Sequence, residues 1–256
     1  MNKANILGVC VDIVELEDVL DMIREVVSTS QCALITHTHI RGLHIAYEQE
    51  WFRDFLNSSD LIYCDGMGVK WGASLLGYHI PQCFPFADWI WQLAELAENH
   101  DFSLFFLGNP PGAAKRAADR FRGHFPKLRI VGTHHGFFNK SIGHPENEIV
   151  VQQINDTRPN ILLVGFGMPS QEMWLKENWQ RLDVNIAITC GALFEYAAKD
   201  LKRGPKWMVE NYLEWLARIY ISPDRYGKRY LRDNPLFLYR ILKQKITCSL
   251  FPKSLG

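Results

Sequence analysis

The stretch "LIYCDGMGVKWGASLLG" (residues 61–77) contains the unit that decides the fold: an apolar strand, a glycine-rich loop and a helix. The strand-like run ends at Asp65, and Gly66 and Gly68 follow before the helical pattern begins. A partly desolvated carboxylate at a strand end can accept a proton from a hydroxyl, as a general base does. It can equally cap the helix that starts near Met67. The local sequence leaves both roles open.

The same unit recurs along the chain. The apolar runs that we expect to form strands are "CALITHT", "DLIYCDG", "FSLFFLG", "LRIVGTHHG", "NILLVGFG" and "VNIAITCG". The amphipathic stretches expected to form helices between them include residues 87–100, 111–124, 147–157 and 170–181. Continuous apolar strands with helical crossovers predict an α/β, Rossmann-like fold, with a mainly parallel sheet and helices on both faces. The first residues, "MNKANILGVCVDIV", predict an edge strand rather than a signal peptide.

Composition indicates a protein with a full hydrophobic core and argues against a membrane-spanning or a zinc-binding protein. The chain has 256 residues, 47% of them hydrophobic, which is enough for a full core. No apolar run approaches the roughly 20 residues that span a bilayer. The six cysteines form no C-x-x-C pair, which indicates buried thiols in a reducing cytosol and argues against zinc.

The last part of the chain differs in pattern and charge. Past Gly204 the strand patterns stop, and residues 205–245 predict two or three helices broken at Pro223 and Pro235. From Lys199 onward there are 13 lysines and arginines against 5 aspartates and glutamates, a net charge of +8, within a chain of zero net charge. We therefore expect an α/β domain over residues 1–200 and a basic, aromatic helical appendage over residues 201–256.

Arginines alternate with aromatic residues in this appendage, and four of them are candidate ligands of an anion: Arg203, Arg218, Arg225 and Arg229. Guanidinium groups match phosphate oxygens, and tryptophan and tyrosine suit a membrane interface. An alternative places the aromatics in a core and the arginines on a solvated surface. Nucleic acid is a third candidate partner, but the neutral total charge and the absence of a nucleic-acid motif argue against it.

Four of the predicted strands end in unusual loops, "THTH", "CDGMG", "LGNPPG" and "GFGMPSQE". In open parallel sheets, ligands bind where such loops converge beyond the carboxyl ends of the strands. Glycine turns leave helix amides open to a phosphate, although tight turns use glycine for its flexibility alone. The candidate binding residues in these turns are Gly66, Gly108, Asn109, Gly165, Gly167, Gln171 and Glu172. Neither G-x-G-x-x-G nor a P-loop occurs, so we expect no NAD, no ATP hydrolysis and no cofactor.

The first of these loops offers hydroxyls and imidazoles. Thr36 and Thr38 could donate hydrogen bonds to a sugar or a phosphate. His37 and His39 share a face of the strand, but no carboxylate or cysteine close in sequence completes a metal site. No D-x-D pair occurs anywhere in the chain, so no metal is expected.

Taken in order, these segments resemble the WecG/TagA/CpsF glycosyltransferases over roughly residues 6–231. The most specific blocks are "FPKLRIVGTHHGFF", "ILLVGFGMPSQEMW" and "RGPKWM…LEWLARIYISPDRYGKRY". The resemblance implies transfer of a sugar from a UDP-sugar to a polyprenyl-diphosphate-linked sugar, with inversion and without a bound metal. Such enzymes act in the assembly of wall teichoic acid, enterobacterial common antigen, capsule or exopolysaccharide.

The resemblance also implies roles for individual residues. Asp65 matches the family's strand-end aspartate, thought to be the catalytic base, and Thr36 matches the family threonine of the first loop. Thr38 replaces an asparagine, and "CFPFAD" replaces the usual R-x-x-G-[ST]-D segment but keeps Asp88. Gln171 is expected near the nucleotide sugar. The arginines expected to include contacts with the diphosphate are Arg203, Arg218, Arg225 and Arg229.

The implied partners are a UDP-sugar donor, a lipid-linked acceptor and the inner leaflet of the plasma membrane. We expect a cytoplasmic protein held peripherally there by its appendage, either as a monomer or as a soluble self-associated form with the appendage displaced. UDP-N-acetylmannosamine, its uronic acid, UDP-glucose and UDP-galactose all stay open as donors. The altered Thr38 and "CFPFAD" positions leave one alternative open, a catalytically inactive UDP-sugar-binding or membrane-scaffold protein of the same fold. The retention of Asp65, Gln171 and the appendage arginines argues against it.

Overall fold

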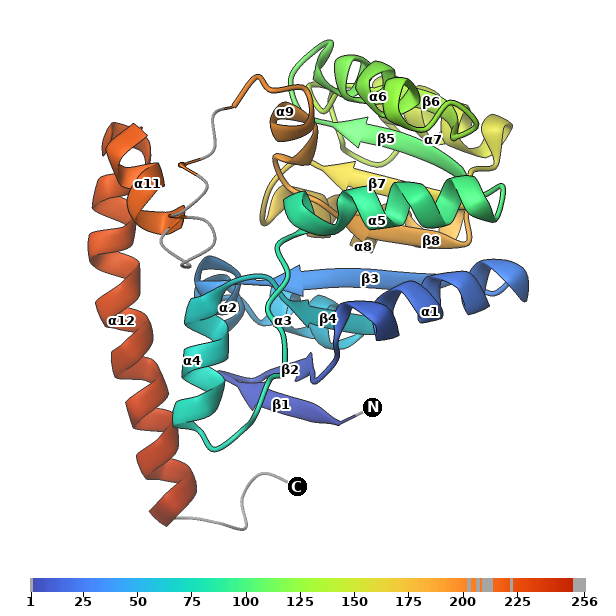
Figure 1. Cartoon of the computed structure of the whole chain (residues 1–256). Coiled ribbons are helices and arrows are strands. Elements are labelled where there is room, and N and C mark those ends of the chain that lie inside the picture. The colour runs from blue at the N-terminus through green and yellow to red at the C-terminus, as the bar shows by residue number, and fades with distance from the viewer. Residues whose placement is uncertain (1, 202–203, 206–207, 209–213, 222, 251–256) are drawn as a thin grey trace.

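The computed structural model describes residues 2–201, 204–205, 208, 214–221 and 223–250. A six-stranded sheet crosses the molecule in the order β4-β3-β8-β7-β5-β6, with every neighbouring pair parallel (Figure 1). Its strands are β3 (Ala33–Thr38), β4 (Leu61–Cys64), β5 (Ser103–Gly108), β6 (Arg129–His134), β7 (Ile161–Gly165) and β8 (Ile186–Thr189). The expected parallel α/β fold is confirmed, and each strand lies within the apolar run that predicted it.

Helices cover both faces of the sheet because successive strand side chains point to opposite sides. Leu34 and Ile62 contribute to one core, and Ile35 and Tyr63 to the other. The helices of the second core are α1 (Leu16–Ser28), α5 (Phe86–Asn99), α6 (Ala113–His124) and α9 (Leu193–Ala197). Those of the first are α2 (Ile40–Glu48), α3 (Glu50–Asn57), α4 (Met67–Leu75), α7 (Pro145–Thr157) and α8 (Ser170–Asn178), which continues into the 3-10 turn η1 (Trp179–Arg181).

The N-terminal segment does not form an edge strand of this sheet, which corrects the expectation from sequence. β1 (Lys3–Ile6) and β2 (Val9–Asp12) pair antiparallel as a separate hairpin. The buried carboxylate of Asp12 accepts a hydrogen bond from the backbone N–H of Ile62 at 2.9 Å. At this point the backbone of edge strand β4 is therefore hydrogen-bonded to a side chain and not to the backbone of another strand.

The C-terminal part contains α11 (Glu214–Ile221) and the long helix α12 (Pro223–Leu250). The expected start at Pro223 is confirmed, but the expected break at Pro235 is wrong, because Pro235 lies inside α12. Proline removes one N–H and crowds the carbonyl four residues earlier. That carbonyl belongs to Leu231, which is 77% exposed, so it can turn toward water and the helix continues.

One face of α12 is attached to the α/β body, beside α2 and α4 (Figure 1). Phe237 and Ile241 are buried against Gly72 of α4. Arg240 donates to His44 Nδ1 at 2.8 Å and to Glu48 at 2.7 Å. These contacts join a helix near the end of the chain to elements formed by its first 75 residues.

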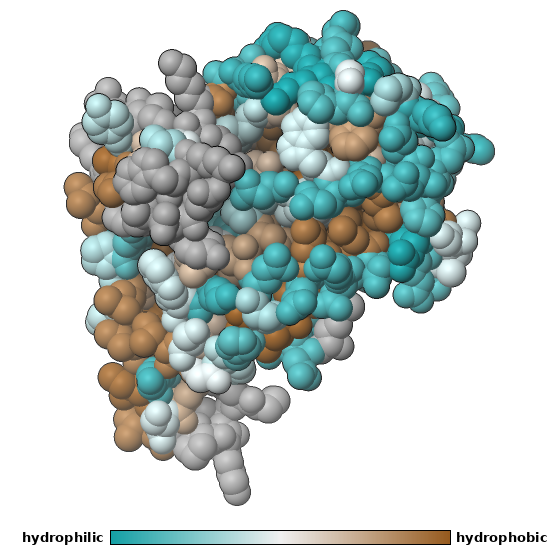
Figure 2. Space-filling model, in the orientation of Figure 1, coloured by the Kyte–Doolittle hydropathy of each residue, from teal (hydrophilic) through white to brown (hydrophobic). Residues whose placement is uncertain are grey.

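The opposite face of α12 is apolar and exposed. We call it the outer face of α12, and its residues are Leu231, Leu238, Tyr239, Leu242, Ile246 and Leu250. Figure 2 shows these hydrophobic residues as a strip along the flank of the molecule. Among the helices described, none has both the length and the apolar character needed to cross a membrane.

All six cysteines are free. Cys64 and Cys190 are buried, as the sequence suggested, whereas Cys32 is exposed and the other three are partly exposed. The expectation of buried thiols therefore holds for two of the six.

Candidate active site at the carboxyl edge of the sheet

Asp65 lies directly after β4, at the carboxyl edge of the sheet. Its N–H donates to the carbonyl of Thr38 at 3.0 Å, so the strand pairing extends one residue past Cys64. The carboxylate is 17% exposed and lies on the α5 side of the sheet, the same side as Tyr63. Helix α4 begins after its N-cap residue Gly66, which has no side chain. Both roles that the sequence left open for Asp65, general base and helix cap, are compatible with this position at the carboxyl edge of the sheet.

A buried histidine lies beside Asp65. His37 Nε2 is 3.5 Å from Asp65 Oδ2, and on the other side of the ring Nδ1 is 3.1 Å from the carbonyl oxygen of Thr189. Burial lowers the pKa of His37 to about 4, so the ring is neutral at cellular pH. From the sequence, His37 was considered only as a possible metal ligand. The described residues include no group of three or more histidine, cysteine or acidic side chains positioned to bind a metal.

Asn109 connects three of the converging loops. Its Nδ2 donates to the carbonyls of Gly165 and Gly191 at 2.7 and 2.8 Å. Its Oδ1 accepts from the N–H groups of Phe194 and Glu195 at 2.8 and 3.2 Å, at the start of α9. The side-chain amide is fully engaged by backbone groups, and the backbone N–H and carbonyl of Asn109 are paired with Gly165 and Gly136, each at 2.8 Å. Asn109 therefore fixes the loops around it.

The glycines that end β5 and β7 allow a close approach between these two strands. Gly108 has a φ of +140°, and a Cβ there would collide with the carbonyl of Gly165. In turn, a Cβ on Gly165 would lie 2.6 Å from the carbonyl oxygen of Gly191. Close backbone packing explains both glycines, and it brings the loops after β5, β7 and β8 together.

Gln171 and Glu172 are both fully buried in the first turn of α8. Gln171 Oε1 accepts from the N–H groups of Gly167 and Gly191, each at 3.1 Å, and its Nε2 donates to Glu172 Oε1 at 2.8 Å. Burial raises the pKa of Glu172 to about 7. Gln171 therefore connects the loops after β7 and β8, while Oε2 of Glu172 is buried without a hydrogen-bond partner among the described residues.

Thr36 and Thr38 lie on the opposite side of the sheet from His37, under α2. Both are fully buried, and the hydroxyl of Thr36 has no hydrogen-bond partner within the described part of the chain. A Cβ placed on Gly42 would lie 2.9 Å from Thr38 Oγ1 and 3.2 Å from Met168 Sδ. The loops after β3 and β7 therefore touch on this side, as the sequence predicted for loops that share an edge.

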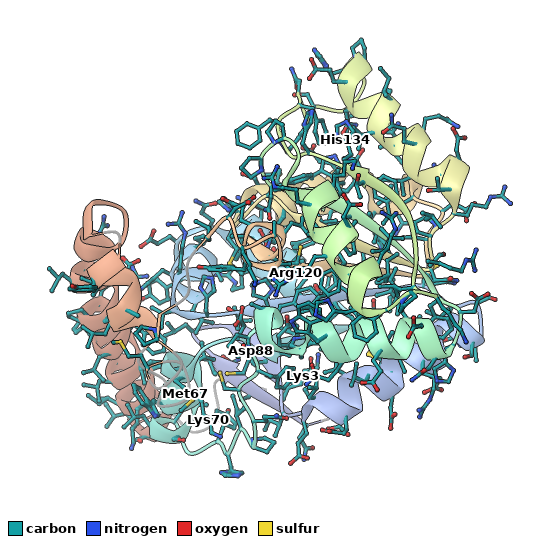
Figure 3. All side chains as sticks on the ribbon, turned by 45° about the horizontal axis from the view of Figure 1, so that its top comes forward. Lys3, Met67, Lys70, Asp88, Arg120 and His134 are labelled. Atoms are coloured by element: carbon teal, nitrogen blue, oxygen red, sulfur yellow. The ribbon has the colours of Figure 1, made fainter. Side chains whose placement is uncertain are left out.

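Asp88 lies in the first turn of α5, and the segment before it is tied to β4, because the N–H of Phe84 donates to the carbonyl of Cys64 at 3.2 Å. Figure 3 shows Asp88 at the start of α5, with Met67 of α4 on the same side of the molecule and His134 well away from both. Arg203 is outside the described residues. Arg218, Arg225 and Arg229 lie in α11 and α12, with side chains outside the described part of the structure.

This arrangement has the features of a ligand-binding α/β enzyme: loops converging at the carboxyl edge of a parallel sheet around a partly exposed carboxylate. A model of the Glycosyl transferase WecG/TagA/CpsF family matches residues 4–249. The chain belongs to this family and is a glycosyltransferase, as the resemblance implied.

Named relatives are similar over almost their whole length. An N-acetylglucosaminyldiphosphoundecaprenol N-acetyl-beta-D-mannosaminyltransferase of Staphylococcus aureus (strain NCTC 8325 / PS 47) is 24% identical over 246 residues, which cover 95% of this chain and 93% of the relative. The protein of the same description from strain MW2 is also 24% identical, with the same coverage.

Proposed function

We propose that the protein transfers a sugar from a UDP-sugar to a polyprenyl-diphosphate-linked sugar, with inversion, in the assembly of a cell-surface polysaccharide. The observation that carries this proposal is Asp65, a partly exposed carboxylate directly after β4, at the carboxyl edge where the loops of the parallel sheet converge. Family membership supports the reaction type. The names of the relatives make an N-acetylglucosaminyl-diphosphate lipid the first acceptor to test and UDP-N-acetylmannosamine the first donor.

In the proposed reaction Asp65 removes the proton from the acceptor hydroxyl. The hydroxyl oxygen attacks the anomeric carbon, and the bond from that carbon to UDP breaks in the same displacement, which inverts the configuration. General-base assistance of this kind contributes on the order of 10²- to 10⁴-fold to a rate. Neutral His37 is compatible with this role, because a neutral ring does not form an ion pair with the carboxylate.

UDP leaves with growing negative charge, and no D-x-D pair is present to hold a metal on the diphosphate. We propose that this charge is balanced by arginines of the appendage, Arg203, Arg218, Arg225 and Arg229, together with the glycine turns after β5 and β7. Gly66, Asp88 and Asn109 complete the proposed donor side, with Gly108, Gly165 and Gly167.

The buried side chains under α2 and α8 are proposed to line the sugar pocket. Thr36 and Glu172 each hold an oxygen without a hydrogen-bond partner within the described residues, and buried polar atoms are normally paired. A sugar hydroxyl reaching either oxygen would satisfy it. Thr38 and Gln171 belong to the same set, because they fix the loops through which a sugar would enter.

We further propose that the protein binds peripherally to the inner leaflet through the outer face of α12. Arg232, Lys243 and Lys245 on the same helix provide positive charge, and each basic residue near an anionic leaflet contributes about 1 kcal/mol. A lipid-linked acceptor makes such binding useful, because the diphosphate then lies near the appendage arginines. Residues 1–200 would hold the catalytic domain and residues 201–256 the membrane-binding appendage.

The test is transfer of radiolabelled sugar from a panel of UDP-sugars to purified polyprenyl-diphosphate-sugar acceptors, by wild type and by Asp65→Asn. We expect one donor to be used by wild type and a loss of at least 100-fold in kcat in the variant, with donor binding retained. Equal transfer by both proteins would exclude Asp65 as the base. No transfer from any donor, with UDP-sugar binding intact, would favour the catalytically inactive binding protein instead.

A further inference from the structure

We propose that His37 is a positioning residue that shares the proton taken up by Asp65, which rests on the proposed role of Asp65 as the base. The contact has a clear geometry. His37 lies on β3, and its imidazole contacts residues of the two strands that flank β3. Thr189 of β8 is on one side, and Asp65, directly after β4, is on the other. His37 is 5% exposed, so the surrounding structure fixes the position of its ring.

The contacts with Thr189 select the tautomer of His37. A carbonyl oxygen only accepts, so the 3.1 Å contact from Nδ1 to Thr189 O requires the hydrogen on Nδ1. Thr189 Oγ1 lies at the same distance and can accept from the same N–H. In the neutral ring, Nε2 then carries a lone pair, and this lone pair faces Asp65 Oδ2 at 3.5 Å.

Two atoms with lone pairs that face each other repel, unless a proton lies between them. In this tautomer one proton between Oδ2 and Nε2 removes the repulsion, so the pair has room for the proton that the acceptor releases. A separation of 3.5 Å is long for a hydrogen bond, but catalytic contacts often shorten only when the substrate is bound. Burial keeps the ring neutral, so Nε2 of this tautomer carries no hydrogen before the reaction.

The other groups around the ring do not compete for the proton. Tyr63, 5.8 Å away between ring centroids, and Cys190 both have a pKa raised by burial, so both are neutral. His39 lies 6.0 Å away between ring centroids, on the same strand end. Of these neighbours, Asp65 alone has an oxygen within reach of Nε2.

The proton balance is as follows. The acceptor O–H bond breaks, its oxygen bonds to the anomeric carbon, and the electron pair of the broken sugar–phosphate bond leaves with UDP. The released proton binds Asp65 and is shared with, or passed to, His37 Nε2. The ring then carries positive charge, and its Nδ1–H bond to Thr189 becomes a charge-assisted bond, which is stronger. Asp65 returns to its charged form when the proton passes to solvent.

Two substitutions separate this role from simple packing. His37→Asn keeps a donor at the Nδ1 position and removes Nε2. His37→Gln places an amide near the Nε2 position, where its NH₂ can donate to Asp65 but cannot accept a proton. The matched control is His124→Asn, because His124 makes the same Nδ1 contact with a backbone carbonyl, that of Arg120 at 3.1 Å, but is on the surface of α6.

We expect kcat to fall about 10- to 100-fold in both His37 variants, with KM for donor and acceptor within threefold. This is less than the roughly 10²- to 10⁴-fold of direct acid–base assistance, because His37 acts through Asp65. Without a shared proton the base is weaker, so the acidic limb of the kcat profile should move to lower pH by roughly one unit. The control variant should match wild type. Full recovery of kcat by His37→Gln would show that hydrogen bonding alone suffices and would overturn the proposal, as would an unshifted limb.

A second measurement does not depend on activity. In the ¹⁵N-histidine NMR spectrum of the wild-type protein at pH 7, the resonances lost in His37→Asn should show a protonated Nδ1 and a bare Nε2. A hydrogen on Nε2 would refute the inference even if Asp65→Asn is inactive. If wild type transfers no sugar at all, the proposed function fails first, whereas normal transfer with unaffected His37 variants overturns the role of His37 alone.

Discussion

Replacing Asn109 tests whether one side chain holds the loops of the site together. Its amide makes four hydrogen bonds with backbone groups of Gly165, Gly191, Phe194 and Glu195. The residue is 7% exposed, so water cannot easily replace these bonds. Its φ of +58° is in the left-handed region, where alanine is disfavoured and glycine is not.

The expected loss of stability follows from these four bonds. An unpaired buried N–H or carbonyl costs about 1–3 kcal/mol, and partial rearrangement reduces the sum. We expect Asn109→Gly to lower the free energy of unfolding by about 3 kcal/mol, and Asn109→Ala by about 1 kcal/mol more because of its backbone conformation. For a chain of this size 1 kcal/mol shifts Tm by about 2–4 °C, so the alanine variant should melt roughly 10 °C below wild type.

Urea unfolding followed by tryptophan fluorescence measures these differences at 25 °C. Asn109→Asp is the matched variant: it keeps the acceptor for Phe194 and Glu195 but turns an oxygen toward the two carbonyls. It should be at least as destabilised as Asn109→Gly. A loss below 1 kcal/mol in both glycine and alanine variants would refute the reasoning. Wild-type stability in the glycine variant alone would show that strain, and not hydrogen bonding, limits this position.

Two other predictions follow from burial and exposure. Because burial raises the pKa of Glu172 from 4.5 to about 7, its protonated form stabilises the fold fully below pH 4.5, and about 3 kcal/mol is lost as pH rises through 7. Glu172→Gln should therefore gain stability over wild type at pH 8 but not at pH 4.5 in urea unfolding, and an equal effect at both values would contradict the buried carboxyl. On the outer face of α12, Leu242→Asp with Ile246→Asp should weaken flotation with anionic vesicles at least tenfold, whereas Thr247→Asp on the same helix should change it less than threefold. Equal binding by wild type and the double variant would exclude this face as the membrane contact.

The sequence alone determined the strands and crossover helices of the α/β sheet and the edge where the candidate site lies. Apolar runs between amphipathic stretches specify parallel strands and crossover helices, because burial on both faces requires that pattern. Asp65, the glycine turns and Gln171 could be named because strand ends in such a fold share one edge. Helix ends were predicted within two residues for α5, α6 and α7 because periodicity is a local property.

Only the tertiary structure decided which of these residues meet. His37 and Thr189 are 152 positions apart, and they touch because β8 lies next to β3 in the sheet order, which no local pattern encodes. The same holds for Asn109, whose bonds to Gly191 and α9 are made across 82 to 86 positions. Pro235 shows the reverse: its local preference breaks a helix, but α12 continues through it, with the crowded carbonyl belonging to exposed Leu231 and with Phe237 and Ile241 packed on α4. A proline inside a helix costs about 3 kcal/mol, and burial of large side chains between distant segments can exceed that cost.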